Sequence, residues 1–190
     1  MLATVAKSLK AQGIPDAHLE AELMVGYVLG VTRAKLYSGL QEEFANDHYV
    51  NVEKMLAARM ERYPLAYLLG HREFYGREFY VAPAVMIPRQ ETETLVERAL
   101  AISVDRTSII VDVGTGSGVI AVTAAAHLPV ATIVAVDISI DALNVAAINA
   151  RHHEVINRVD FVMGDLLGPI VGPVDMVIAN LPYIPEGDLE

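Results

Sequence analysis

The hydrophobic and polar positions divide the chain into two parts that follow different periods. Up to about residue 70, apolar residues recur at the three- and four-residue spacing of amphipathic helices. This pattern predicts one helix around Leu2–Leu9, a second from a cap at Asp16 to Gly30, and a third over residues 46–62 that Pro64 stops. Residues 33–37 are predicted to form a short turn. The first part is therefore expected to be all-helical.

Two aromatic-rich runs follow, residues 72–75 and 78–81, with Gly76 and Arg77 between them. Their spacing predicts a β-hairpin with a two-residue turn. Two prolines farther on mark an extended linker, so we expect the domain boundary in this stretch. The predicted organisation is a helical domain over residues 1–70, a hairpin and linker over 71–90, and a second domain over 91–190.

The second part alternates short apolar runs with helical patterns, which implies βαβ units and a parallel sheet. The first two predicted strands are almost continuously apolar, as expected where helices cover both faces of a sheet. The chain ends soon after the fourth strand. Because a long apolar edge strand is seldom left exposed, we expect a sheet truncated after that strand. The predicted strands are 108–113, 132–137, 158–163 and 174–179, and the predicted helices are 91–102, 117–127 and 140–152.

Composition narrows the class of protein. Apolar residues make up 53% of the chain and charged residues 20%, which is typical of a globular protein. A formal net charge of −10 disfavours non-specific binding to nucleic acid or to anionic membranes. The absence of cysteine excludes disulfides and Cys-based zinc sites, and no His cluster has the spacing of a metal site. No signal-peptide or membrane-spanning run is found, so we expect a cytoplasmic protein.

A glycine-rich loop follows the first strand of the second part: Val-Asp-Val-Gly-Thr-Gly-Ser-Gly, residues 111–118. Glycines let the backbone turn tightly and approach a ligand, and the next helix offers free N–H groups to an anionic group. A dinucleotide fingerprint would need glycine at position 119, which is Val119. The spacing therefore favours the loop of an S-adenosylmethionine-dependent methyltransferase over an NAD site. A tight turn without a ligand is the alternative.

Two acidic residues follow later strands. Asp137 ends the second strand, about 20 residues after the glycine loop, where a carboxylate accepts hydrogen bonds from ribose hydroxyls. Ser139 is the better candidate for the cap of the next helix. Asp165 follows the third strand and is a candidate acceptor for an adenine amino group, with Leu166 packing on the ring. A turn or capping role for Asp165 remains open from the spacing alone.

The fourth strand leads directly into Asn180-Leu181-Pro182-Tyr183. With this motif the chain resembles the PrmC/HemK family, which methylates the amide nitrogen of a glutamine in peptide chain release factors. The resemblance covers essentially the whole chain. It is carried by the helical front part, Pro64–Gly70, Phe74-Tyr75-Gly76, Ile87-Pro88-Arg89 with Thr92-Glu93, the glycine loop and the Asn-x-Pro-Tyr-Ile segment.

The resemblance implies an α/β protein with an N-terminal helical bundle and a class I, Rossmann-like methyltransferase sheet. It implies S-adenosyl-L-methionine as cofactor, no metal, and a release factor as the protein partner that the helical module helps to recognise. Residues 89–93 are expected to line or close the cofactor pocket. The expected cofactor-binding residues are Gly114, Thr115, Gly116, Ser117, Gly118, Asp137, Asp165, Leu166 and Asn180; the expected catalytic and substrate-binding residues are Asn180, Leu181, Pro182 and Tyr183.

The last motif suits an amide nitrogen, which is a poor nucleophile because its lone pair is delocalised. The Asn180 side-chain oxygen is predicted to accept one N–H of the target and the carbonyl of Leu181 the other. Tyr183 is predicted to stack on the planar amide. The family usually has proline at position 181, so Leu181 lacks a fixed φ and relaxes the restraint on Asn180. The family also often has proline directly after the arginine, at the position of Gln90 in this chain.

Two other functions remain open from the sequence. The last motif is shared with adenine-N6 and cytosine-N4 methyltransferases of nucleic acids, although the acidic composition and the lack of a basic stripe argue against that substrate. A non-catalytic fragment that binds the cofactor or a release factor is the second alternative, because the sheet is expected to be truncated and Leu181 departs from the family.

Overall fold

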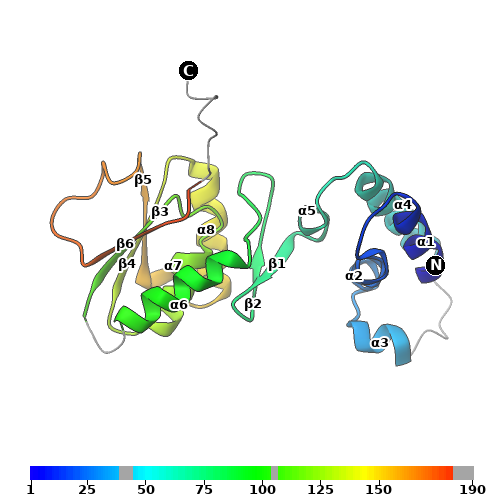
Figure 1. Ribbon diagram of the computed structural model, residues 1–190, viewed down its shortest axis with the longest axis horizontal. Helices are drawn as coiled ribbons and strands as arrows, with labels where there is room; N and C mark the ends of the chain where they lie inside the picture. The colour runs from blue at the N-terminus through cyan, green and yellow to red at the C-terminus, as the bar shows by residue number, and fades with distance from the viewer. Residues whose placement is uncertain (39–44, 104–106, 182–190) are drawn as a thin grey trace, which may run out of the picture. The chain divides into compact units, whose positions relative to one another are not determined.

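The computed structural model describes residues 1–38, 45–103 and 107–181, which form two compact units, Met1–Gly70 and His71–Glu190. Within the described residues, no helix is long and apolar enough to cross a membrane. The first unit contains α1 (Leu2–Ala11), α2 (Ala17–Leu29), α3 (Arg33–Ser38), α4 (Asn46–Met60) and α5 (Leu65–Leu69) (Figure 1).

The helices of the first unit enclose a core of their own that includes Leu9, Met24 and Leu36, each fully buried. Arg59 on α4 forms a bidentate ion pair with Glu20 on α2, in which Nε and Nη2 lie 2.6 and 3.0 Å from the two carboxylate oxygens. Residues 33–37, predicted as a turn, lie within α3, and α5 was not predicted at all. Both helices are too short to show a helical period in the sequence.

The second unit begins with a β-hairpin, β1 (His71–Phe74) and β2 (Arg77–Tyr80). The turn is Tyr75-Gly76, not Gly76-Arg77 as predicted, and both turn residues have positive φ, 52° and 69°. Positive φ at both positions is the geometry of a type I′ turn, which suits the twist of a hairpin. Phe74 and Phe79, with ring centroids 6.0 Å apart, are buried in the main core of this unit. The hairpin therefore packs as part of the second unit.

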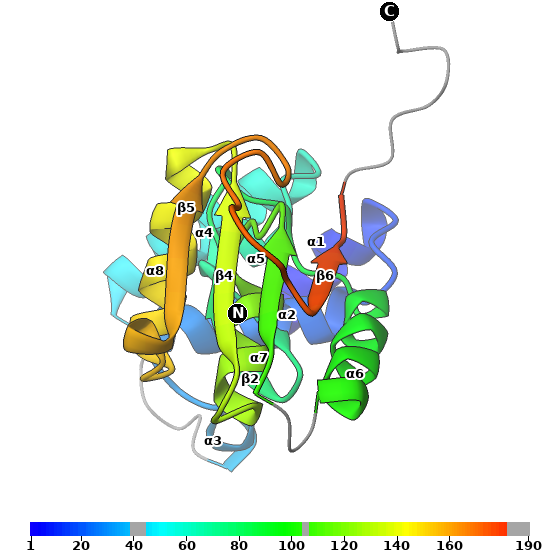
Figure 2. The ribbon, with the colours of Figure 1, turned by 90° about the vertical axis from the view of Figure 1, so that its left-hand side faces the viewer.

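The rest of the second unit alternates helix and strand. Its elements are α6 (Glu91–Ser103), β3 (Ile109–Val113), α7 (Val119–His127), β4 (Thr132–Asp137), α8 (Ile140–His152), a 3-10 turn (Ile156–Arg158), β5 (Val159–Met163) and β6 (Met176–Ala179). The four strands are parallel in the order β5-β4-β3-β6 (Figure 2). The predicted strands and helices are confirmed, with boundaries that shift by up to two residues.

Helices α6, α7 and α8 lie on one face of the sheet (Figures 1 and 2). Side chains alternate along the strands: Ile110 and Ile133 point into the core under these helices. Val111, Val113 and Val136 belong to a second cluster, which Ile170 and Val174 of the segment after β5 help to cover. Because all four strands are parallel, their carboxyl ends lie along one edge of the sheet.

Candidate active site

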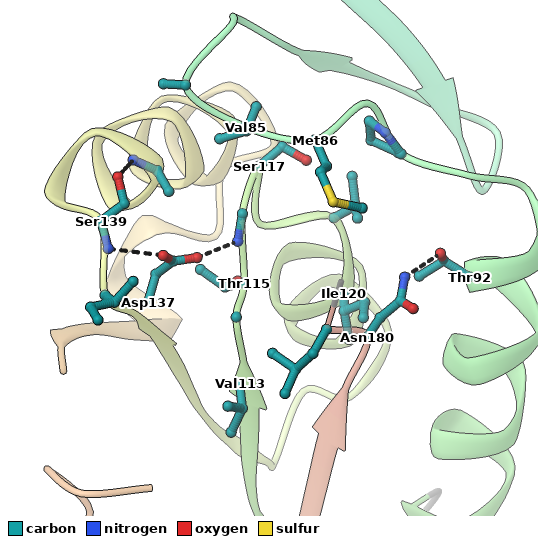
Figure 3. A pocket seen from close by; sticks show the side chains of 18 of the residues that line it. Val85, Met86, Thr92, Val113, Thr115, Ser117, Ile120, Asp137, Ser139 and Asn180 are labelled. Atoms are coloured by element: carbon teal, nitrogen blue, oxygen red, sulfur yellow. Dashed lines mark hydrogen bonds between the residues drawn. The ribbon is translucent and has the colours of Figure 1, made fainter. Parts of the chain in front are cut away.

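A cavity of about 570 Å³ lies at the carboxyl edge of the sheet. It is lined by residues that end or follow each of the four strands, among them Val113, Asp137, Gly164 and Asn180. Open α/β sheets bind their ligands at this edge, and a cavity of this volume suits a ligand of nucleoside size. Figure 3 shows side chains from the glycine loop, from the segment before α6 and from the end of β6 around the same space.

The loop after β3 crosses toward β4 and then turns into α7. The backbone N–H groups of Gly114 and Thr115 both donate to the carbonyl of Val136, at 2.9 and 3.0 Å. Gly118 donates to the carbonyl of Thr115 at 2.8 Å and precedes the first residue of α7. Backbone hydrogen bonds thus hold the loop in place at both ends.

The three glycines of this loop have φ of 68°, 55° and 79°, a region that side chains rarely tolerate. A Cβ on Gly118 would lie 2.8 Å from the Cβ of Ala146, so glycine here lets α7 and α8 approach closely. A Cβ on Gly114 would lie 2.6 Å from Leu181 Cδ2. At Gly116 the nearest atom would be 4.0 Å away. The middle glycine therefore presents bare backbone to the cavity.

Asp137 is held by two backbone N–H groups. Its Oδ2 accepts from Gly116 and its Oδ1 accepts from Ser139, both at 2.9 Å (Figure 3). Each carboxylate oxygen has two lone pairs, so each can accept a further hydrogen bond from a ligand. Ser139 caps α8 through its own hydroxyl, which accepts from Ala142, as predicted. The carboxylate is therefore fixed in orientation at the rim of the cavity.

Asp112 supports the glycine loop from the interior of the protein. It is 1% exposed, and its Oδ2 accepts from the Thr115 hydroxyl at 2.6 Å and from the Ala121 N–H at 3.2 Å. Its Oδ1 is buried without a hydrogen-bond partner among the described residues. Burial raises the pKa of this carboxyl to about 6, against the lowering effect of the two hydrogen bonds, and the negative charge of Asp137 adds to the rise. The sequence analysis did not single out Asp112.

The opposite wall of the cavity is built by Asn180 and α6. The Asn180 Nδ2 donates to the hydroxyl of Thr92 at 2.8 Å, and Thr92 is 5% exposed in the first turn of α6 (Figure 3). Leu181, which is 39% exposed, lies over Gly114 and joins this wall to the glycine loop. The same cavity is thus bounded by the loop on one side and by the Asn180 amide on the other.

The third region of the cavity follows β5. Gly164 donates its N–H to the carbonyl of Asp137 at 3.0 Å, which brings this turn beside the end of β4. Asp165 and Leu166 both line the cavity and are exposed, and Leu166 has a positive φ of 47°. Ile138 lines the same space and is 72% exposed. An apolar side chain left this exposed at a cavity offers a surface for a flat ring.

The structure brings most of the predicted site residues together. Arg89 and Thr92 line the cavity, whereas Glu93 points elsewhere and accepts the Tyr75 N–H at 3.0 Å. Gly118 is buried against Ala146 and does not line the cavity. Pro182 and Tyr183 lie outside the described residues. The predicted residues that line the cavity are Gly114, Thr115, Gly116, Ser117, Asp137, Asp165, Leu166, Asn180 and Leu181.

Some lining residues were missed from the sequence. Val85 and Met86, in the predicted linker, border the cavity (Figure 3). Ile138 lines it as well. Nothing in the local sequence marks these apolar residues as lining a cavity. Among the residues that the structure describes, no group of three or more His, Asp or Glu side chains could hold a metal ion.

Comparisons with known proteins agree with this geometry. Residues 1–70 match the family model of the PrmC N-terminal domain, and residues 91–189 match the methyltransferase small domain. Similar curated proteins are the release factor glutamine methyltransferases of Moorella thermoacetica and Koribacter versatilis. The first is 42% identical over 99% of this chain and 67% of its own length, and the second is 40% identical over 95% and 65%. The chain spans about two thirds of the length of these relatives.

A solved structure, an RNA methyltransferase from Salinibacter ruber in complex with S-adenosyl-L-homocysteine, is 30% identical to this chain. The match covers 52% of this chain and 61% of that protein, with a TM-score of 0.43.

Proposed function

This chain belongs to the family of release factor glutamine methyltransferases, and from that premise we propose that it methylates the side-chain amide nitrogen (N5) of a glutamine in a peptide chain release factor. The methyl donor is S-adenosyl-L-methionine. With a release factor as substrate, we expect the reaction in the cytoplasm, where translation ends. The helical unit, residues 1–70, is the part we assign to recognition of the release factor.

The residues around the cavity fit this cofactor. Gly116 leaves open space beside the backbone, where a side chain would otherwise stand. Asp137 keeps free lone pairs for ribose hydroxyls while two backbone N–H groups fix its orientation. Asp165 and the apolar side chains of Ile138 and Leu166 offer an acceptor and flat packing surfaces for the adenine. Gly114, Thr115 and Ser117 also line the cavity, and would hold the methionine part of the cofactor.

The Asn180 wall fits an amide substrate. With Nδ2 engaged by Thr92, the Oδ1 of Asn180 is the atom left to accept an N–H of the glutamine amide. The carbonyl of Leu181 is the second acceptor. Two such bonds orient the nitrogen lone pair and favour the positive charge that develops on nitrogen as it is methylated. S-adenosyl-L-methionine supplies an activated methyl group and a good leaving group, so this chain acts mainly by positioning.

The observation that carries the proposal is the meeting of two features in one cavity. Asp137 and the glycine loop lie on one side, and an amide oriented by Thr92 lies on the other. The first feature alone is common to many methyltransferases. The second suits an acceptor that donates N–H bonds, such as an amide or an exocyclic amine. Membership of the family then favours the glutamine of a release factor.

The test combines cofactor binding with methyl transfer. Calorimetry measures S-adenosyl-L-methionine binding, and mass spectrometry measures the methyl group gained by a purified release factor. The expected result is binding together with methylation at one glutamine, lost when that glutamine is replaced by alanine. Binding without methylation of the release factor, while duplex DNA becomes methylated, would show that the acceptor is wrong. Absence of both binding and transfer would contradict the cofactor assignment as well.

A further inference from the structure

The hydrogen bond between Asn180 and Thr92 joins two segments 88 residues apart in the chain. Thr92 belongs to the first turn of α6 and is 5% exposed, whereas Asn180 follows β6 and is half-buried. Two hydrogen bonds hold the first turn of α6 in place. The Thr92 N–H donates to the carbonyl of Arg89, and the Glu93 carboxylate accepts from the Tyr75 N–H. The hydroxyl of Thr92 is therefore presented to Asn180 from a fixed place.

The two ends of an asparagine side chain have nearly the same shape but opposite hydrogen-bonding character. The oxygen accepts hydrogen bonds and the NH₂ group donates two. A target amide that must be held by its N–H groups needs the oxygen of Asn180 in the cavity. If the side chain were turned over, the NH₂ group would face the N–H of the target, and the two donors would oppose each other.

We propose that Thr92 is a positioning residue that holds the Asn180 side chain in place through the hydrogen bond between the Thr92 hydroxyl and Asn180 Nδ2. Its hydroxyl oxygen accepts from Nδ2 (Figure 3), so Oδ1 is the atom of this amide left to accept an N–H of the substrate. Thr92 does not touch the reacting atoms in this proposal; it acts through Asn180. The inference rests on the proposed function, because it presupposes a target that donates N–H bonds to Asn180.

Valine at position 92 has the shape of threonine but accepts no hydrogen bond. Because Asn180 is only half-buried, its freed NH₂ group can reach water. The packing of α6 is therefore retained, and the change acts mainly on the orientation of Asn180. Small errors in the placement of a reacting group cost much in rate. We expect Thr92→Val to lower kcat for glutamine methylation about tenfold or more.

The chain offers two matched comparisons. Thr92→Ser keeps the hydroxyl and is expected to restore kcat to within about threefold of the wild type. Thr94→Val makes the same chemical change at an exposed position two residues along α6, and it is expected to leave kcat unchanged. For all three variants, the dissociation constant of S-adenosyl-L-methionine and the thermal midpoint are expected to stay at the wild-type values.

Equal kcat for Thr92→Val and Thr94→Val would overturn the proposal while leaving the proposed function intact. A loss in Thr92→Ser as large as in Thr92→Val would also overturn it, because shape rather than the hydroxyl would then matter. Failure of the wild type to methylate glutamine would instead contradict the proposed function.

The orientation itself can be read without activity, from the ¹⁵N NMR signals of the Asn180 NH₂ group, assigned by their absence in Asn180→Asp. The proposal expects these signals to shift and to exchange faster with water in Thr92→Val, but not in Thr94→Val. Unchanged Asn180 signals in Thr92→Val would overturn it.

Discussion

The two walls of the cavity are built in different ways. On the glycine-loop side, backbone groups hold one another: Gly114 and Thr115 both bond to the carbonyl of Val136, and Asp137 is gripped by two backbone N–H groups. On the opposite side, the Asn180 side chain is held by a hydrogen bond to the side chain of Thr92. Among the described residues, several interactions hold the first wall, whereas one hydroxyl holds the Asn180 side chain of the second.

This difference separates two kinds of sensitivity. Changes on the glycine-loop side should disturb folding and cofactor binding, because the loop geometry is part of the packing of α7 and α8. Changes on the Asn180 side should spare both and appear in the rate of transfer. Single substitutions on each wall test whether the two sensitivities separate in this way.

The largest effect is expected at Gly118. A Cβ there would lie 2.8 Å from the Ala146 Cβ and 3.0 Å from its Cα, at a φ of 79°. Gly118→Ala should lower the free energy of unfolding by about 2–5 kcal/mol through overpacking and backbone strain. Urea unfolding measures this change.

Gly116→Ala is the matched comparison for Gly118→Ala. It shares the positive φ but meets no atom closer than 4.0 Å. It should cost only about 1–2 kcal/mol of stability while weakening cofactor binding, because its Cβ enters the cavity. Equal losses of stability in the two variants would show that strain alone, and not the contact between α7 and α8, sets the requirement for glycine.

The next effect concerns pH and Asp112. Its folded-state pKa of about 6 lies above the ordinary value of 3.8, so the folded chain binds this proton more readily than the unfolded chain. The contribution of Asp112 to the free energy of unfolding therefore falls as pH rises from about 4 to about 6, by up to about 3 kcal/mol. Urea unfolding of the wild type and of Asp112→Asn at about pH 4 and about pH 7 measures it.

Asp112→Asn should remove this component of the pH dependence. Asp141→Asn, which neutralises an exposed carboxylate in the first turn of α8, should keep it. The same pH dependence in wild type and Asp112→Asn would mean that Asp112 is ionised in the folded chain at low pH, and that its buried oxygen is better solvated than the structure indicates.

Asp137→Ala should act on binding more than on folding. It removes the acceptor proposed for the ribose and frees the Gly116 N–H. Hydrogen bonds to charged groups contribute about 1.5–3 kcal/mol, so the dissociation constant of S-adenosyl-L-methionine should rise about 10- to 150-fold. Calorimetry of Asp137→Ala beside Asp141→Ala measures this, since the second variant removes an exposed carboxylate a few residues away. An equal effect of both would point to a general loss of negative charge.

The backbone-built wall is also the one that could be predicted from the sequence. The spacing of the glycines, the alternation of strand and helix and the place of Asp137 are local features, and the structure brings them together at the carboxyl edge of the sheet. The hairpin turn was misplaced by one residue because tyrosine at positive φ is rare, yet Tyr75 adopts it. Local sequence features were therefore sufficient to predict most of the fold and the glycine-loop wall of the cavity.

The Asn180 wall could be predicted only in part. The motif itself is local, but its contact with Thr92 spans 88 residues and depends on how α6 docks beside β6. Met86 and Ile138 were missed for the same reason, because an apolar residue gives no local sign that it will border a cavity. What sequence patterns lack here is the packing that brings distant side chains together.

The smallest effect is expected for Leu181→Pro, which adds a backbone restraint to the Asn180 wall. Proline fixes its own φ and favours an extended Asn180, so less freedom is lost when the glutamine amide binds. Restraints of this kind contribute about 0.4–1 kcal/mol. If the activation free energy falls by this amount, kcat rises about two- to fivefold. Release-factor methylation at saturating cofactor measures it.

Leu181→Ala separates the restraint from the side chain. Leu181 lies over Gly114, so both substitutions empty the same space beside the loop, but only proline restricts the backbone. If alanine raised kcat as much as proline, the leucine side chain would be what slows transfer. A gain in kcat confined to proline would mean that the unrestrained backbone of the Asn180 wall limits the rate of methyl transfer. The glycine-loop wall, which is held by backbone hydrogen bonds, has no such limit.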